Sequence, residues 1–142
     1  ILGIKPSNTV MSHNGNIIKY KKNIKFHTLV VRPNFGCSTK YIYSKVKSFS
    51  KSQFNSPQKK MFELEYLKTL KNDLEKIVFK KYPPLKKIKS FLQNTSDNIF
   101  TRMSGSGSSI VAYFNSKRAC SNAYSQFKRK FSGHWCIVSK TI

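Results

Sequence analysis

The stretch Arg102-Met103-Ser104-Gly105-Ser106-Gly107-Ser108-Ser109 lies between two strand-like segments, Asn98–Met103 and Ser109–Phe114. Its glycines permit backbone conformations with positive φ, and its small side chains let successive N–H groups converge on an anion. Gly-x-Gly turns also occur in plain hairpins. The stretch therefore predicts a strand–loop–strand unit, and its role as an anion site stays open at this point.

The loop does not match the common nucleotide-binding patterns. A P-loop requires a lysine after its last glycine, and no lysine follows here. A dinucleotide-binding turn opens a helix, whereas the residues that follow this loop, Ile110–Phe114, are apolar and typical of a strand. Any site in this loop is therefore one between strands.

Hydrophobic periodicity and turn residues predict the other elements. Before the loop we expect a hairpin over 9–20 turning at Asn14-Gly15, a strand over 26–31, and a helix capped by Ser38 or Thr39 that carries Ile42, Val46 and Phe49. A polar loop over 50–58 follows, and then a long helical region over 62–78, which is either one helix or two with the second capped at Asn72-Asp73. A further helix is opened by Pro83-Pro84. After it we expect a helix capped by Ser116 and a last strand over 134–138 with Trp135 in the core. This order predicts an α+β fold with a mainly antiparallel sheet and helices packed on one side.

Composition sets limits on function. The 142 residues carry a net charge of +22, but 23 of the 27 basic residues are lysines, spread from Lys5 to Lys140. We interpret them as a solvated basic surface, since a dedicated nucleic-acid surface favours clustered arginine. Three widely spaced cysteines without a CxxC pair argue against disulfides and zinc and fit a reducing, cytoplasmic compartment. No apolar run reaches the roughly 18 residues of a membrane span, so we expect no membrane partner.

Several segments together resemble the GHMP small-molecule kinases. The glycine-serine stretch with its apolar flank resembles the third motif of that family. The resemblance is strongest to the branch that phosphorylates 4-diphosphocytidyl-2-C-methyl-D-erythritol, and it covers about 29–142. The other segments that carry it, in family order, are Val30-Val31-Arg32-Pro33, Cys37-Ser38-Thr39-Lys40, Asn72-Asp73-Leu74-Glu75 and Tyr82-Pro83.

The resemblance implies a division of the chain. Ile1-Leu2-Gly3 is similar to the residues just after the family's catalytic aspartate segment. Residues 1–27 are then the tail end of an N-terminal kinase domain, and residues 28–142 are a GHMP kinase C-terminal domain. The ATP-binding loop and the catalytic aspartate belong to the missing N-terminal kinase domain, so we expect the chain to be inactive alone.

The resemblance also implies a reaction, the transfer of a phosphoryl group from ATP, with Mg, to the 2-hydroxyl of the methylerythritol moiety in non-mevalonate isoprenoid biosynthesis. We expect no catalytic residue and no metal ligand in this chain. Thr39 matches a threonine near the substrate in the family. The residues expected to hold phosphate oxygens or substrate hydroxyls are Ser104, Gly105, Ser106, Gly107 and Ser108.

Other side chains are interpreted as structural. We assign Asp73 to a helix cap and Glu75 to a lysine-rich helix, and we expect His13, His27 and His134 to be surface or core histidines. Two other functions stay open: a related kinase acting on another alcohol such as homoserine or mevalonate, and a basic RNA-binding module.

Overall fold

The computed structural model describes residues 8–11, 17–20, 25–51, 56 and 58–141. The chain forms two compact units. The first unit comprises Ile1–Lys25, Ser50–Leu70 and Thr141–Ile142, and the second comprises Phe26–Phe49 and Lys71–Lys140.

The first unit contains a hairpin and two short helices. Strands β1 (Asn8–Met11) and β2 (Ile17–Tyr20) pair antiparallel, which confirms the predicted hairpin; its expected turn at Asn14-Gly15 lies outside the described residues. The 3-10 helix η1 (Lys59–Phe62) contacts both strands and precedes α2 (Leu64–Thr69).

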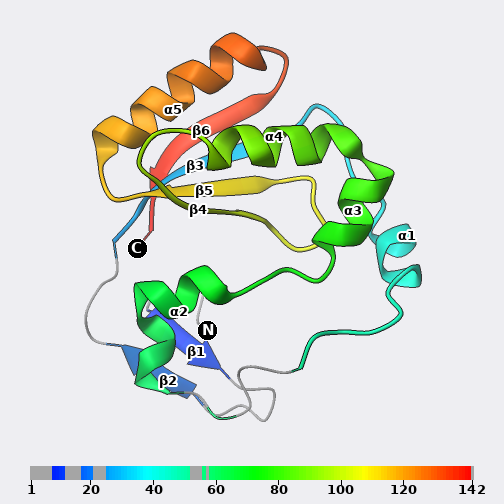
Figure 1. The fold of residues 1–142 in the computed structure, drawn as a ribbon, viewed down its shortest axis with the longest axis vertical. Coiled ribbons are helices and arrows are strands. Elements are labelled where there is room, and N and C mark those ends of the chain that lie inside the picture. The colour runs from blue at the N-terminus through cyan, green and yellow to red at the C-terminus, as the bar shows by residue number, and fades with distance from the viewer. Residues whose placement is uncertain (1–7, 12–16, 21–24, 52–55, 57, 142) are drawn as a thin grey trace. The chain divides into compact units, whose positions relative to one another are not determined.

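The second unit is built on a four-stranded sheet in the order β4-β5-β3-β6, with every neighbouring pair antiparallel. The strands are β3 (His27–Arg32), β4 (Asn98–Met103), β5 (Ile110–Phe114) and β6 (Trp135–Lys140). The glycine-serine stretch joins β4 to β5, as the sequence predicts (Figure 1).

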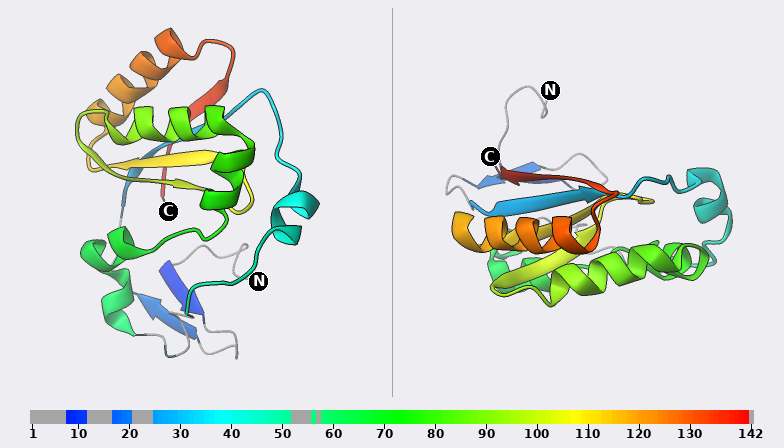
Figure 2. Two further views of the ribbon diagram at one scale, coloured as in Figure 1. Left: turned by 45° about the vertical axis from the view of Figure 1, so that its right-hand side comes forward. Right: turned by 90° about the horizontal axis from the view of Figure 1, so that it is seen from above.

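Two long helices, α4 (Pro83–Gln93) and α5 (Lys117–Lys130), lie on the same side of this sheet (Figure 2). Both begin where the sequence predicts. Pro83 and Pro84 occupy the first turn of α4, where a missing N–H costs nothing, and Ser116 caps α5 by accepting the Ala119 N–H. The α+β class with an antiparallel sheet and helices on one side is confirmed.

The core lies between the sheet and these helices. In β3 and β5 the residues that alternate toward the helices are fully buried, as the period of two requires. The buried core side chains with no exposure are Leu29, Val31, Ile110, Ala112 and Phe114 from the strands, Ile42 from α1 (Thr39–Ser44), Val78 from α3 (Glu75–Lys81), Leu85 and Leu92 from α4, and Cys120 and Phe127 from α5.

The helical region expected over 62–78 is divided, as the alternative reading of Asn72-Asp73 allowed. It breaks into η1, α2 and α3, with extended backbone at Leu70. The side-chain oxygen of Asn72 accepts the Leu74 N–H at 3.0 Å, a local bond that competes with helix and starts a new one. The four-residue spacing of apolar residues therefore spans two units rather than one helix.

Two expectations at single residues are wrong. The helix that begins after Ser38 ends at Ser44, and Phe49, assigned to its apolar face, is 64% exposed. Trp135 was expected in the core but is 54% exposed. It begins an edge strand on which Cys136 and Val138 turn toward the core, so the alternation directs Trp135 to the helix-free face.

Candidate functional site

The Gly-Ser loop, Ser104–Ser109, is closed by its own backbone. The Ser104 N–H donates to the Ser109 carbonyl at 2.9 Å, and the Gly107 N–H donates to the Ser104 carbonyl at 2.9 Å. Gly105 has φ +50° and Gly107 has φ +82°, conformations that side chains disfavour. The positive φ expected from the sequence is therefore present at both glycines.

The two glycines differ in their surroundings. A Cβ at Gly107 would lie 3.1 Å from both Cys37 Sγ and Met103 Sδ, closer than packing allows without movement. A Cβ at Gly105 would meet no atom within 4 Å. Gly107 is thus required by backbone and packing together, whereas Gly105 is required by backbone conformation alone.

Three backbone donors of the loop have no partner within the described part of the chain: the N–H groups of Gly105, Ser106 and Ser108 take part in none of its hydrogen bonds. Unpaired N–H groups in a turn with positive φ attract anions and polar oxygens. The loop therefore offers backbone N–H donors to an anion or a polar oxygen, although its own sequence contains no lysine.

Thr39 reaches the loop from the start of α1. Its Oγ1 lies 2.9 Å from Ser106 Oγ in a hydrogen bond between the two hydroxyls. Ser38, not Thr39, caps α1: its Oγ accepts the Tyr41 N–H at 3.3 Å, while its own N–H donates to the Tyr82 hydroxyl at 3.2 Å. Of the two residues expected as caps, Ser38 is the cap, and Thr39 instead lies beside Ser106 of the predicted phosphate loop.

Asn72 and Glu75 hold the base of the loop. The Asn72 amide donates to the carbonyls of Met103 at 3.0 Å and Gly105 at 2.8 Å. Glu75 Oε1 accepts the Met103 N–H at 3.0 Å, and Oε2 pairs with Lys89 at 2.5 Å. These contacts agree with a structural role for Glu75, which stays a prediction. The sequence pointed to Asn72 only as a family motif and helix start, because its loop partners are about 30 positions away.

Arg102 lies in β4, just before the Gly-Ser loop, on the face opposite the buried Thr101 and Met103. Its guanidinium carbon lies 4.8 Å from the centroid of the Phe100 ring, which itself stacks on Tyr113 at 4.3 Å. Burial lowers the pKa of Arg102, while nearby Tyr113 and Glu75 raise it; its ordinary value is high enough that the side chain stays a cation. Arg102 therefore places a positive charge over the Phe100 ring, on the strand that leads into the loop.

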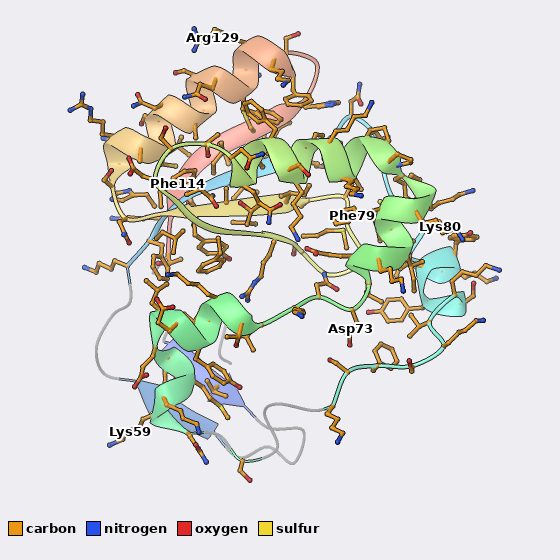
Figure 3. All side chains as sticks on the ribbon, in the orientation of Figure 1. Lys59, Asp73, Phe79, Lys80, Phe114 and Arg129 are labelled. Carbon is orange, nitrogen blue, oxygen red and sulfur yellow. The ribbon has the colours of Figure 1, made fainter. Side chains whose placement is uncertain are left out.

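A cationic cavity of ≈ 780 Å³ lies beside α1 and α3. The ammonium groups of Lys45 and Lys81 lie 5.6 and 5.0 Å from the centroid of the Tyr41 ring. Asp73 and Lys80, from just before α3 and near its end, are labelled in Figure 3. The cavity is lined by Tyr41, Lys45, Val46, Lys47, Ser48, Asp73, Lys76, Ile77, Lys80 and Lys81. Five lysines facing one carboxylate favour an anionic occupant.

The remaining titratable side chains have other surroundings. His134 Nδ1 accepts the Asn34 N–H at 3.4 Å and its ring stacks on Phe131, as expected of a structural histidine; His27 lies on β3, and His13 is outside the described residues. Across the described ranges, no three His, Cys, Asp or Glu side chains gather in a way that would hold a metal ion.

The cysteines are all free thiols: Cys37, Cys120 and Cys136. Burial raises the pKa of each thiol, that of Cys120 to about 11. They are therefore poor nucleophiles at neutral pH. A search of the described helices for a membrane-crossing segment finds none with the needed length and apolarity.

Comparison with known proteins identifies relatives. The chain is 66% identical over all 142 residues to the 4-diphosphocytidyl-2-C-methyl-D-erythritol kinase of Pelagibacter ubique, of which it covers 50%. It is 31% identical over 144 residues to the kinase of the same name from Thermodesulfovibrio yellowstonii, with 94% of the chain and 49% of that protein covered. The chain thus spans about half the length of the curated relatives it matches.

Solved structures share the fold. A 4-(cytidine 5'-diphospho)-2C-methyl-D-erythritol kinase matches 86% of this chain and 45% of its own with a TM-score of 0.62 at 20% identity. The homoserine kinase of Cytophaga hutchinsonii matches 94% of this chain and 47% of its own with a TM-score of 0.67 at 16% identity. The family model described as GHMP kinases C terminal matches residues 46–133, well over half of the chain. With the Gly-Ser loop between two antiparallel strands and helices on one side of the sheet, the chain belongs to the GHMP kinases C-terminal family.

Proposed function

We propose that the polypeptide containing this chain transfers the γ-phosphoryl group of ATP to the 2-hydroxyl of 4-diphosphocytidyl-2-C-methyl-D-erythritol. The hydroxyl oxygen forms a bond to the γ-phosphorus, the bond from that phosphorus to the leaving ADP oxygen breaks, and the hydroxyl proton passes to a base. The observation that carries the proposal is the 66% identity, over the whole chain, with the Pelagibacter ubique kinase of that name.

The Gly-Ser loop supplies positioning and electrostatic stabilisation in this proposal. Phosphoryl transfer needs little covalent participation from the protein and depends on donors placed where charge develops. The N–H groups of Gly105, Ser106 and Ser108 are such donors. The hydroxyls of Ser104 and Ser106 and the Gly107 backbone complete the loop, and Thr39, bonded to Ser106, contacts the substrate.

The nucleotide fits the donors of this chain. Unpaired loop N–H groups and the lysine-lined cavity suit phosphate oxygens. Among the described residues, no cluster of three carboxylate, imidazole or thiolate groups is present. In this proposal Mg accompanies ATP and neutralises its phosphates, and it is held by the nucleotide and by residues of the N-terminal kinase domain.

The division of labour follows the family resemblance. We propose that residues 1–27 are the end of the N-terminal kinase domain, which provides the ATP-binding loop and the catalytic aspartate. Residues 28–142 then provide the loop and Thr39 but no catalytic base. The chain alone is expected to transfer no phosphate, and the complete cytoplasmic enzyme is expected to be active.

A second function from the same family is a kinase for another alcohol, such as homoserine. The fold match to a homoserine kinase, with a TM-score of 0.67, is as good as the match to the methylerythritol kinase structure. Both matches are at 20% identity or less, so they support the fold alone. The much higher sequence identity to the Pelagibacter ubique protein favours the first substrate.

A substrate panel on the full-length protein tests the proposal. ADP release is measured with ATP, Mg and, separately, the cytidine-diphosphate methylerythritol, homoserine and mevalonate. We expect release with the first substrate alone, and a new phosphate monoester at its 2-position by ³¹P NMR. Turnover of homoserine or mevalonate in its place contradicts the substrate assignment, and no turnover with any alcohol contradicts the kinase assignment.

A further inference from the structure

We propose that Asn72 and Glu75 are positioning residues that set the direction of a loop N–H group toward the reacting phosphate. We call this pair the Asn72–Glu75 clamp. The proposal rests on the proposed function for its catalytic consequence, whereas the clamp itself stands on contacts within the second unit. Glu75 is the first residue of α3 and Asn72 lies three residues before it, about 30 positions before the residues that the pair contacts.

The clamp lies along β4, at the edge of the sheet that the described residues form. Among the described strands, β4 pairs only with β5, and Met103 is the last residue of that ladder, opposite Ile110. Its N–H donates to Glu75 Oε1 and its carbonyl accepts from Asn72 Nδ2. In an antiparallel strand both groups of one residue point to the same side. Two side chains thus replace the neighbouring strand at the point where the loop begins.

The Asn72 amide has one orientation that fits its partners. Both of its N–H bonds go to carbonyl oxygens, those of Met103 and Gly105, and its oxygen accepts the Leu74 N–H. Rotating the amide by half a turn would place its oxygen against two carbonyls and its N–H₂ against an N–H. An aspartate at this position keeps the acceptor for Leu74 but loses both donors.

The bond to Gly105 carries the functional consequence. The carbonyl of Gly105 and the N–H of Ser106 belong to one planar trans peptide unit and point in opposite directions. Because Asn72 holds this carbonyl at 2.8 Å, the Ser106 N–H points away from the clamp. That N–H is one of the three loop donors without a partner within the described residues. Asn72 therefore orients the Ser106 N–H through the Gly105 carbonyl, without contacting that N–H itself.

The clamp is itself fixed by the core. Glu75 pairs with Lys89 of α4 at 2.5 Å, and the two side chains are only 18% and 16% exposed. Leu74, between the two clamp residues, is buried, and Val78 one turn further along α3 has no exposure. Helices α3 and α4 thus hold the clamp residues against the packed core.

The test compares Asn72→Asp with Asn94→Asp in the full-length protein. Asn94 is exposed, directly follows the last residue of α4 and makes no side-chain hydrogen bond among the described residues. Asn94→Asp therefore introduces the same charge as Asn72→Asp without removing a contact to the loop. For Asn72→Asp we expect kcat to fall about 100-fold, the loss typical of misplacing a reacting group by about 1 Å, with the KM for the alcohol substrate within about threefold. Asn94→Asp is expected to change neither.

A second pair of variants covers the case in which Asn72→Asp does not fold. Glu75→Gln keeps an oxygen that accepts the Met103 N–H, whereas Glu75→Met removes it. We expect Glu75→Gln to retain most of kcat and Glu75→Met to lose it. Equal loss in both variants would assign the role of Glu75 to its charge pair with Lys89 and would overturn the proposal for Glu75.

Hydrogen–deuterium exchange separates positioning from turnover. In Asn72→Asp we expect faster exchange in the peptide spanning 102–109, since Met103, Ser104 and Gly107 donate the bonds that the clamp supports, and unchanged exchange in α5. Unchanged exchange in 102–109, or an unchanged kcat, would overturn the proposal. Faster exchange throughout the protein would show that Asn72 stabilises the whole fold rather than positioning the loop, and it would overturn the proposal too. If wild type transfers no phosphate to any alcohol, the proposed function fails, and the exchange in 102–109 still decides the clamp.

Discussion

At the scale of single residues, Gly107 is constrained both by its backbone conformation and by the packing around it. Its φ of +82° excludes a side chain on backbone grounds, and the sulfur atoms of Cys37 and Met103 fill the space that a Cβ would need. Gly105 is subject to the first constraint only, and Gly36 to neither. These three positions form a graded series.

We predict that stability falls in the order Gly36→Ala, Gly105→Ala, Gly107→Ala. A left-handed conformation costs an alanine about 1–2 kcal/mol, and Gly107→Ala adds a contact at 3.1 Å to two sulfur atoms. Urea unfolding followed by circular dichroism measures the differences. A Gly107→Ala protein as stable as Gly105→Ala would show that Cys37 and Met103 move aside without cost.

Cys120 is a second residue with a measurable consequence. Burial raises its pKa from 9.0 to about 11, so at pH 8 it has about a hundredfold less thiolate than an unperturbed thiol. We predict that iodoacetamide modifies Cys37 and Cys136 before Cys120 in the folded protein, and all three at similar rates in urea. Mass spectrometry of tryptic peptides over time gives the rates. Equal rates in the folded protein would contradict the burial of Cys120.

At the scale of elements, local sequence accounts for some boundaries and not others. Ser116 and Pro83-Pro84 predict the starts of α5 and α4 correctly, because a cap and a first-turn proline act through neighbouring atoms. The sequence left open whether the 62–78 region forms one helix or two. The carbonyls that hold Asn72 at the break belong to Met103 and Gly105, which are remote in sequence. Trp135 was misplaced because size and aromaticity do not reveal which face of an edge strand a residue occupies.

The candidate site shows the same limit. The pattern of small residues predicted the Gly-Ser loop and its positive φ, since both follow from the residues themselves. The bond from Thr39 to Ser106 and the clamp at the loop base join residues 28 to 67 positions apart. Only the packed fold reveals those pairs. The roles of the loop and of Thr39 in binding stay predictions.

The α5 cap provides the test at this scale. Ser116→Ala removes the oxygen that accepts the Ala119 N–H, and we predict a loss of about 1 kcal/mol in the free energy of unfolding. Ser125→Ala is the matched control: Ser125 is exposed within the same helix, where alanine has the higher helix propensity. Thermal or urea unfolding measures both. Equal effects of the two changes would mean that the cap does not stabilise α5.

At the scale of the whole molecule, charge dominates. A net charge of +22 on 142 residues attracts any polyanion at low salt, whereas the structure gathers lysines around one cavity that suits a small anion. Specific RNA binding is distinguished from non-specific electrostatic attraction by how the affinity depends on salt and on the RNA sequence.

We predict that the chain binds labelled RNA homopolymers with equal affinity and that binding falls steeply as salt rises. Counterion release produces a slope of about −0.7 for each phosphate contacted in a single strand. Fluorescence anisotropy with poly(A) and poly(C) across a salt series measures both features. Tight binding of one sequence at physiological salt would favour an RNA-binding module and contradict the kinase assignment.

The clamp also bears on how the loop tolerates change. The hydrogen bonds that Asn72 and Glu75 make at the base of the loop go to backbone atoms of Met103 and Gly105, so the loop side chains, its two glycines apart, are free to diverge while the clamp stays intact. A chimaera that imports a relative's loop should therefore keep its geometry if 72–75 is left in place. One that imports 72–75 from a relative lacking Asn or Glu should lose it, whatever loop it carries.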